Sequence, residues 1–143
     1  MRKTLSIIFG ILSAFVVISL IEMINHILYP MPANLNPNEM QAIQEWIKTL
    51  PALAYLIVLL AYFMGSVVGG AIARLIHRNS MATAITVGCV MFLAGVANFL
   101  MIRAPVWFAV ICLLTYVPSA CFGAWIVGAL STKKPKHIVR DFA

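Results

Sequence analysis

Four apolar runs, each about as long as a membrane is thick, constrain this chain more than any other feature. The runs are Leu5–Leu28, Ala52–Leu75, Met81–Ile102 and Val106–Leu130. A helix needs about 20 predominantly apolar residues to cross a bilayer. Because the runs use most of the chain, they leave no room for a separate soluble domain. We therefore expect an all-α fold in which residues 1–143 form a single four-helix transmembrane bundle.

The positive charges lie almost entirely on one side of these runs, although the whole chain carries a net charge of +6. The basic residues on that side are Arg2, Lys3, Arg74, Arg78, Lys133, Lys134, Lys136 and Arg140. Only Lys48 and Arg103 fall on the other side. The positive-inside rule then predicts a multi-pass protein of a bacterial-type inner membrane. Both termini, including the tail 131–143, are expected in the cytoplasm. The charge is a topology signal, so we expect the lipid bilayer as a partner and no nucleic acid.

The first loop predicts a short amphipathic helix over residues 37–50. Asn36 is a suitable N-cap, Pro37 suits the first turn, and Glu39 completes a capping-box pattern. The apolar residues at helical spacing are Met40, Ile43, Ile47 and Leu50. With Trp46 at the headgroup level, this helix is expected to lie on the outer surface over the mouth of the bundle. The alternative is an amphipathic helix that simply packs on its own bundle.

The second and fourth apolar runs resemble each other without a gap. The stretch "PALAYLIVLLAYFMGSVVGGAIA" from Pro51 aligns with "PVWFAVICLLTYVPSACFGAWIV" from Pro105, and Tyr62 matches Tyr116. The two runs have the same direction across the membrane, so the similarity indicates a parallel duplication of a helical hairpin. The alternative is a chance similarity between two apolar sequences.

Small residues recur at four-residue spacing in these two runs. They are Gly65, Gly69, Ser119 and Gly123. Such surfaces allow helix backbones to approach closely inside a membrane. We expect them to pack the second span against the fourth. Contact between chains, in a homodimer or a larger membrane complex, is the alternative.

The stretch "SLIEMINHILYP" places polar residues on one face of the first span. Glu22 and His26 are four residues apart, and Glu22 lies about 25 Å along the helix from Leu5, near the outer boundary of the membrane. Asn98 and Arg103 fall at a similar height on the third span. The candidate site residues are Glu22, Asn25, His26, Tyr29, Asn98, Arg103, Tyr62 and Tyr116.

Three interpretations of Glu22 follow, because an unpaired carboxylate in hydrocarbon is costly. It is a structural residue paired with Arg103 or hydrogen-bonded to Asn98 and a tyrosine; a metal ligand together with His26; or a proton-titrating group in a solute cavity. Two ligands are too few for a metal site. The three cysteines contain no CxxC pair. We therefore expect no metal and no cofactor. Tyr62 and Tyr116 belong either to the site or to an aromatic core.

Catalytic motifs are missing from the sequence: it has no Ser-His-acid set, no HExxH, no phosphate loop and no paired carboxylates. We expect a protein that is not an enzyme. A single carboxylate in the first of four helices resembles the small multidrug-resistance exporters in architecture and size. Glu22 lies nearer the outer end than that family's pattern has it, and the long first loop is foreign to the family. More broadly, the chain resembles small four-helix bacterial membrane proteins.

Two classes of function follow from these features. The first is an accessory or scaffold subunit, or a bundle that binds a lipid or a small solute in an outward-facing polar pocket. The alternative is a small proton-coupled transporter, similar to an exporter, in which Glu22 is the titrating group.

Overall fold

The computed structural model describes residues 1–36, 39–77, 80–102 and 105–132, which form five α-helices and no strand. The helices are α1 (Arg2–Leu28), α2 (Met40–Thr49), α3 (Ala52–Ile76), α4 (Ala82–Met101) and α5 (Val106–Thr132). All but α2 are long and apolar enough to cross a membrane. These four helices agree with the predicted spans to within one turn, and the predicted all-α fold class is confirmed.

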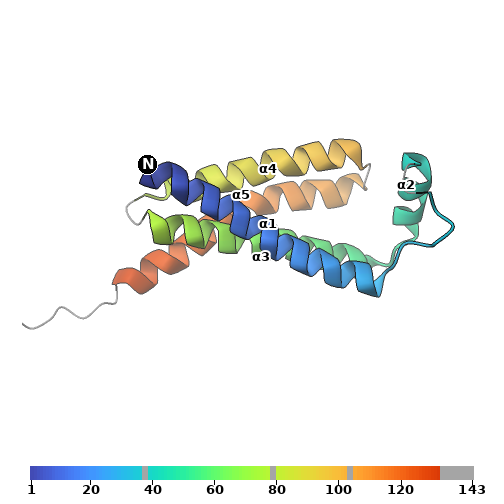
Figure 1. Cartoon of the computed structure of the whole chain (residues 1–143), viewed down its shortest axis with the longest axis horizontal. Helices are drawn as coiled ribbons and strands as arrows, with labels where there is room; N and C mark the ends of the chain where they lie inside the picture. The colour runs from blue at the N-terminus through green and yellow to red at the C-terminus, as the bar shows by residue number, and fades with distance from the viewer. Residues whose placement is uncertain (37–38, 78–79, 103–104, 133–143) are drawn as a thin grey trace, which may run out of the picture.

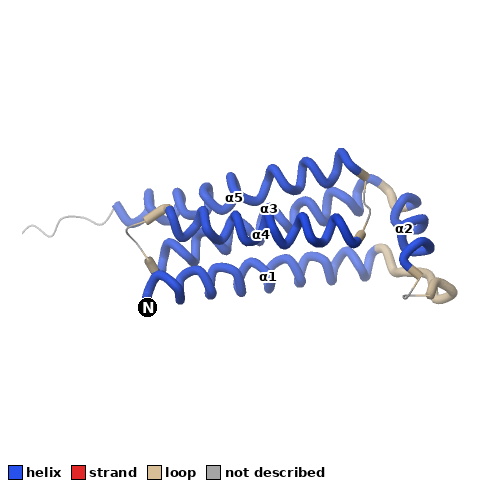
Figure 2. The backbone as a smooth tube through the Cα atoms, turned by 90° about the horizontal axis from the view of Figure 1, so that it is seen from above, coloured by secondary structure: helices blue, strands red, loops and turns tan. Residues whose placement is uncertain are grey.

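Helix α3 lies at the centre of the bundle. It packs against α1, α4 and α5, while α4 also contacts α1 and α5 (Figures 1 and 2). The apolar helices alternate in direction, so α3 and α5 run the same way, as the sequence predicts. Helix α2 lies across one end of the bundle, which we call the α2 end (Figure 2).

The contact between α1 and α3 depends on small residues. A Cβ atom added to Gly69 would lie 2.8 Å from the carbonyl oxygen of Gly10, and one added to Gly65 would lie 2.5 Å from Cγ1 of Ile18. Both distances are too short for a side chain, so the two backbones are in direct contact. Helix α1 contributes a buried stripe at four-residue spacing: Ser6, Gly10, Ala14 and Ile18. Close approach of this kind is how helices associate where lipid surrounds them.

The contact between α3 and α5 uses a different face of α3. A Cβ atom on Gly70 would overlap the backbone of Ala120, and one on Gly123 would overlap the backbone of Val67. The expectation that Gly65 and Gly69 pack against the fourth span is therefore corrected, since both face α1. Each residue turns a helix by about 100°. Consecutive small residues at 69 and 70 thus give the central helix two close contacts on two faces.

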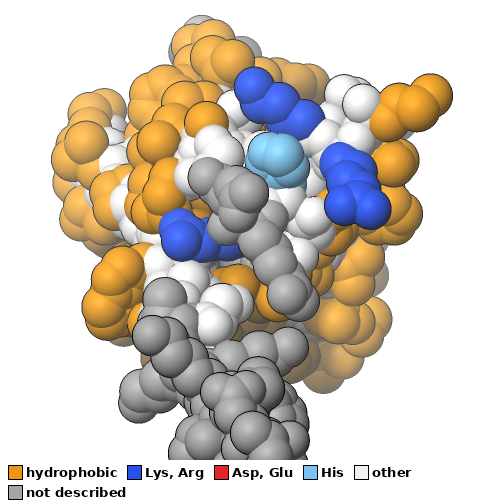
Figure 3. Space-filling model, turned by 90° about the vertical axis from the view of Figure 1, so that its left-hand side faces the viewer, with side chains coloured by type: hydrophobic (Ala, Val, Ile, Leu, Met, Phe, Trp, Pro, Cys, Tyr) orange, Lys and Arg blue, Asp and Glu red, His pale blue; other side chains and the backbone are white. Residues whose placement is uncertain are grey.

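The end of the bundle opposite α2 is basic. Arg2 and Lys3 are exposed there, and Arg74 and His77 are half-buried. Figure 3 views the bundle from this side and shows the basic side chains gathered on it. We call it the basic end. The positive-inside rule predicts that it faces the cytoplasm.

Helix α2 begins later than the sequence predicts. Its N-cap is Glu39, and Asn36 instead closes a turn in which the Glu39 N–H donates to the Asn36 carbonyl oxygen over 3.0 Å. The expected helix over 37–50 is therefore observed as Met40–Thr49, and residues 37–38 of the expected range lie outside the described residues. Helix α2 is fastened to α3 by the Tyr55 hydroxyl, which donates to the carbonyl oxygen of Ile47 over 2.6 Å.

Candidate functional site

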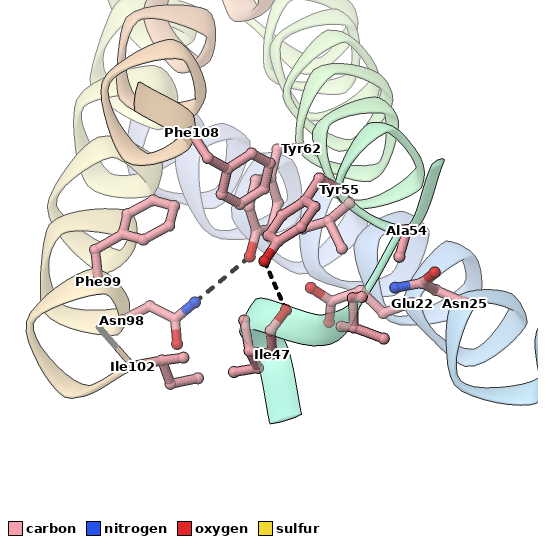
Figure 4. Close-up of a pocket in the computed structure, with 12 residues that line it drawn as sticks. Glu22, Asn25, Ile47, Ala54, Tyr55, Tyr62, Asn98, Phe99, Ile102 and Phe108 are labelled. Carbon is pink, nitrogen blue, oxygen red and sulfur yellow. Dashed lines mark hydrogen bonds between the residues drawn. The ribbon is translucent and has the colours of Figure 1, made fainter. Parts of the chain in front are cut away.

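Polar side chains from three helices meet near the α2 end. The Asn98 amide on α4 donates to the Tyr62 hydroxyl on α3 over 3.4 Å. The Glu22 side chain on α1 lines the same space as this pair. Figure 4 shows the three side chains directed into one space between the helices. Tyr62 is itself buried and therefore holds a polar group at a fixed place among the spans.

A cavity of about 280 Å³ opens from this polar group toward the α2 end. We call it the outer cavity. Its lining comes from all five helices: Glu22, Asn25, Ile47, Leu50, Ala54, Tyr55, Val58, Tyr62, Asn98, Phe99, Ile102 and Phe108. Ile47 and Leu50 form the side nearest α2, so α2 covers the outer cavity. Most of the lining is apolar or aromatic, with a few convergent polar groups, as is usual for a small-molecule site.

A second cavity, of about 220 Å³, extends from the same polar group toward the middle of the bundle. We call it the groove cavity. Its lining comes mainly from α1 and α4: Phe15, Ile18, Ser19, Glu22, Tyr62, Met91, Ala94, Gly95, Asn98 and Tyr116. The two cavities share Glu22, Tyr62 and Asn98. The Glu22 carboxylate is therefore accessible to a molecule in either cavity.

The floor of the groove cavity is made by two aromatic rings and a glycine. Tyr116 packs against Tyr62 with ring centroids 5.5 Å apart. A Cβ atom on Gly95 would lie 2.6 Å from Cε2 of Tyr116, so glycine is what leaves room for this ring. Gly95 is not among the residues predicted from the sequence, because no spacing distinguishes it from other small residues of the spans.

The wall of the outer cavity is an aromatic cluster. The Tyr55 ring contacts Phe108 at a centroid distance of 5.1 Å and Trp107 at 5.9 Å, and Phe99 contacts Phe108 at 5.9 Å. The Tyr55 hydroxyl holds Ile47 of α2. Tyr55 thus joins the wall of the cavity to its cover. The sequence shows only that Tyr55 begins a span at this end of the bundle.

The described residues that line the site carry charge of one sign only. Among the described residues that line the two cavities, Glu22 is the one acidic side chain, and none is basic. Glu22 is exposed as a residue, and its side chain lines both cavities. A carboxylate within a membrane-spanning helix requires a counter-charge, donors or water. Arg103, one of its expected partners, lies outside the described residues.

The remaining candidates lie at the margin of the site. Asn25 lines the outer cavity, and its buried amide oxygen has no hydrogen-bond partner among the described residues. His26 is exposed and belongs to neither lining. Tyr29 ends α1, its N–H donating to the Asn25 carbonyl oxygen over 2.9 Å. Within the described ranges, no three His, Cys, Asp or Glu side chains come together as a metal site would require.

The fold and the site define a class of protein: a small multi-pass membrane protein with a polar, aromatic-walled pocket at one end of its helical bundle. Comparison with protein-family models, with curated proteins and with solved structures finds no match to this chain. The geometry of the two cavities is therefore what indicates a function for this protein.

Proposed function

We propose that this protein binds a small organic cation in the outer cavity, with the Glu22 carboxylate as its counter-charge. The observation that supports the proposal is the one-sided charge of the site: one carboxylate serves both cavities, and no described basic residue lines either. A bound cation supplies the charge that a carboxylate at this depth requires. Binding of a small solute in an outward-facing pocket is one of the functions that the sequence predicts.

The walls of the outer cavity suit a cation as well. Tyr55 and Phe108 present aromatic rings to the space beside Glu22 (Figure 4). The face of an aromatic ring attracts a cation, and the attraction is stronger when water is excluded. Tyr62, held by Asn98, lines both cavities beside Glu22, so the group that meets the ligand is positioned before binding.

Butylamine is a suitable first probe, with the neutral butanol as its uncharged analogue. We expect butylamine to raise the melting temperature of the purified protein in nanodiscs, because a ligand that binds only the folded state stabilises it. Glu22→Gln should abolish this shift while keeping the fold. Glu45→Gln is the matched control, since Glu45 is exposed on α2 outside both cavities. An equal shift by butanol, or an undiminished shift in Glu22→Gln, would refute the proposal.

A second candidate is proton-coupled export of such a cation. The observation that favours it is the position of Glu22, whose side chain faces both cavities and so meets a proton or a cation from either. In proteoliposomes, a pH gradient should then drive movement of butyltrimethylammonium, a permanently charged cation that does not cross lipid unaided, and Glu22→Gln should eliminate this movement. Binding without gradient-driven movement would support the binding function and refute export. Absence of both would favour the accessory or scaffold role.

A further inference from the structure

We propose that the natural ligand is a single-chain, long-chain primary amine that reaches Glu22 sideways from the bilayer, with its hydrocarbon chain in the groove cavity. This inference rests on the proposed function and deepens it, because it names the class of ligand and its route. The outer cavity alone calls only for a cation. The groove cavity, which meets it at Glu22, accounts for the apolar part of the ligand.

The groove cavity has the polarity of an amphiphile. Glu22 and Asn98 lie at one end, and further along the cavity Phe15, Ile18 and Met91 supply apolar surface, with Ser19 and Tyr116 among them. From Glu22 back to Phe15, α1 rises about 10 Å. A molecule with a donor head at Glu22 and a chain directed toward the middle of the bundle matches both ends of this cavity.

The groove cavity also lies at the surface of the bundle. Phe15 and Ser19 on α1 and Ala94 on α4 line it and are exposed. Helices α1 and α4 diverge toward the α2 end (Figure 1), whereas α1 packs closely on α3 through its small residues. Both helices have the character of membrane spans. Their exposed residues therefore face lipid, and the groove between them is open to molecules dissolved in the bilayer.

The head group follows from the chemistry around Glu22. An anionic head would be repelled by the carboxylate, and an uncharged head would supply no counter-charge. A protonated primary amine carries one positive charge and three N–H donors. The residues in the shared lining of the two cavities that carry acceptor oxygens are Glu22, Tyr62 and Asn98.

Photo-crosslinking in nanodiscs tests the inference. The probe is a long-chain primary amine with a diazirine at the far end of its chain, and a diazirine derivative of butylamine serves as the short probe. We expect the long probe to label groove residues such as Phe15, Met91 and Ala94, and the short probe to label the outer cavity near Phe108. Glu22→Gln should reduce both signals by at least about tenfold.

A pair of variants on α4 separates the groove from the lipid surface. Ala94→Phe fills the groove and should reduce labelling by the long probe about tenfold, without changing labelling by the short probe. Ala97→Phe places the same bulk on an exposed α4 position outside both cavities and should change neither. Ser19→Leu fills the groove from α1 and should reproduce the effect of Ala94→Phe, even if Ala94→Phe does not fold.

The outcomes are distinguishable. This inference would be overturned if the long probe labelled lipid-facing Leu93 and Leu100 as strongly as the groove residues, and if filling the groove left that labelling unchanged. If the short probe still labelled the outer cavity in a Glu22-dependent way, the proposed function would stand. Groove labelling by a long-chain alkyl sulfate carrying the same diazirine would overturn the assignment of an amine. Labelling by both amines that ignores Glu22→Gln would refute the inference and the proposed function together.

Discussion

Tyr62 and Tyr116 pack ring against ring, with centroids 5.5 Å apart and planes inclined by 37°. The two residues occupy matching positions in the similar sequences of α3 and α5. Their surroundings nevertheless differ. The Tyr62 hydroxyl accepts a hydrogen bond from Asn98, and Tyr62 lines both cavities beside Glu22, whereas the Tyr116 ring fills the space that Gly95 leaves open. One tyrosine therefore organises the polar group, and the other shapes the floor of the groove cavity.

Replacing each tyrosine by phenylalanine should separate these roles. Tyr62→Phe keeps the ring contact but removes the hydroxyl that accepts from Asn98 and lines both cavities beside Glu22. Because a hydrogen bond from the charged ammonium to this hydroxyl oxygen contributes about 1.5–3 kcal/mol, we expect butylamine binding to weaken by at least about tenfold. Tyr116→Phe is the matched control and should weaken binding much less. The measurement is a titration of the melting temperature in nanodiscs, and equal losses in the two variants would contradict the assignment.

The membrane spans, and the depth of the polar residues along them, could be predicted from the sequence, because both depend on chain length and hydropathy alone. The sequence alone identifies Glu22, Tyr62 and Asn98 as candidate site residues. Their meeting could not be predicted, since it depends on how far each helix is rotated about its axis. Apolar residues cover every side of these spans, so hydropathy carries little information about rotation. The prediction that Gly65 and Gly69 pack against the fourth span is wrong for the same reason.

Other parts of the site depend on single contacts that no pattern marks. The Tyr55 hydroxyl meets a backbone carbonyl of α2, and any residue at position 47 offers the same carbonyl. Gly95 is defined by the ring it accommodates, which comes from another helix. The groove cavity exists because α1 and α4 diverge, and this divergence follows from packing against α3 rather than from either sequence alone.

Tyr55→Phe should loosen the cover of the outer cavity. The variant removes the bond to the Ile47 carbonyl oxygen, which is worth about 1 kcal/mol. Amide hydrogen exchange across 40–49 should then become about fivefold faster. The global melting temperature should change little, because the ring remains packed on Phe108. Tyr29→Phe, at the same end but outside both cavities, should leave exchange in α2 unchanged. Unaltered exchange in Tyr55→Phe would show that other contacts hold α2.

Gly123→Ala should destabilise the bundle. The new methyl group would overlap the backbone of Val67, so α3 and α5 must move apart. Overpacking of this kind costs about 1–3 kcal/mol, and we expect a lower melting temperature in detergent. Gly128→Ala is the control, because the three atoms nearest its added Cβ belong to the guanidinium of Arg74, the end of a flexible side chain. Equal tolerance of the two variants would mean that the close contact of α3 with α5 does not support the bundle.

Labelling of lysines in intact cells should reveal the orientation of the bundle. Lys48 is exposed on α2, and Lys3 is exposed at the basic end. The positive-inside rule places Lys3 in the cytoplasm and Lys48 outside. An impermeant amine reagent should therefore label Lys48 in intact cells, and Lys3 only after permeabilisation. Labelling of Lys3 before permeabilisation, with Lys48 protected, would reverse the topology and place the outer cavity on the cytoplasmic side.

A double-mutant cycle between Glu22 and Arg103 decides between a ligand-binding carboxylate and a structural ion pair. If Glu22 serves a ligand, Glu22→Gln and Arg103→Gln should change the free energy of unfolding independently, with additivity to within about 0.5 kcal/mol. A buried structural pair behaves differently, because removing one partner leaves an uncompensated charge and costs about 3–5 kcal/mol. The double variant then recovers part of that loss. We expect additive effects in reversible unfolding in detergent, and loss of butylamine binding only in the variants that lack Glu22. Strong coupling, with each single variant less stable than the double, would assign Glu22 to the architecture of the bundle.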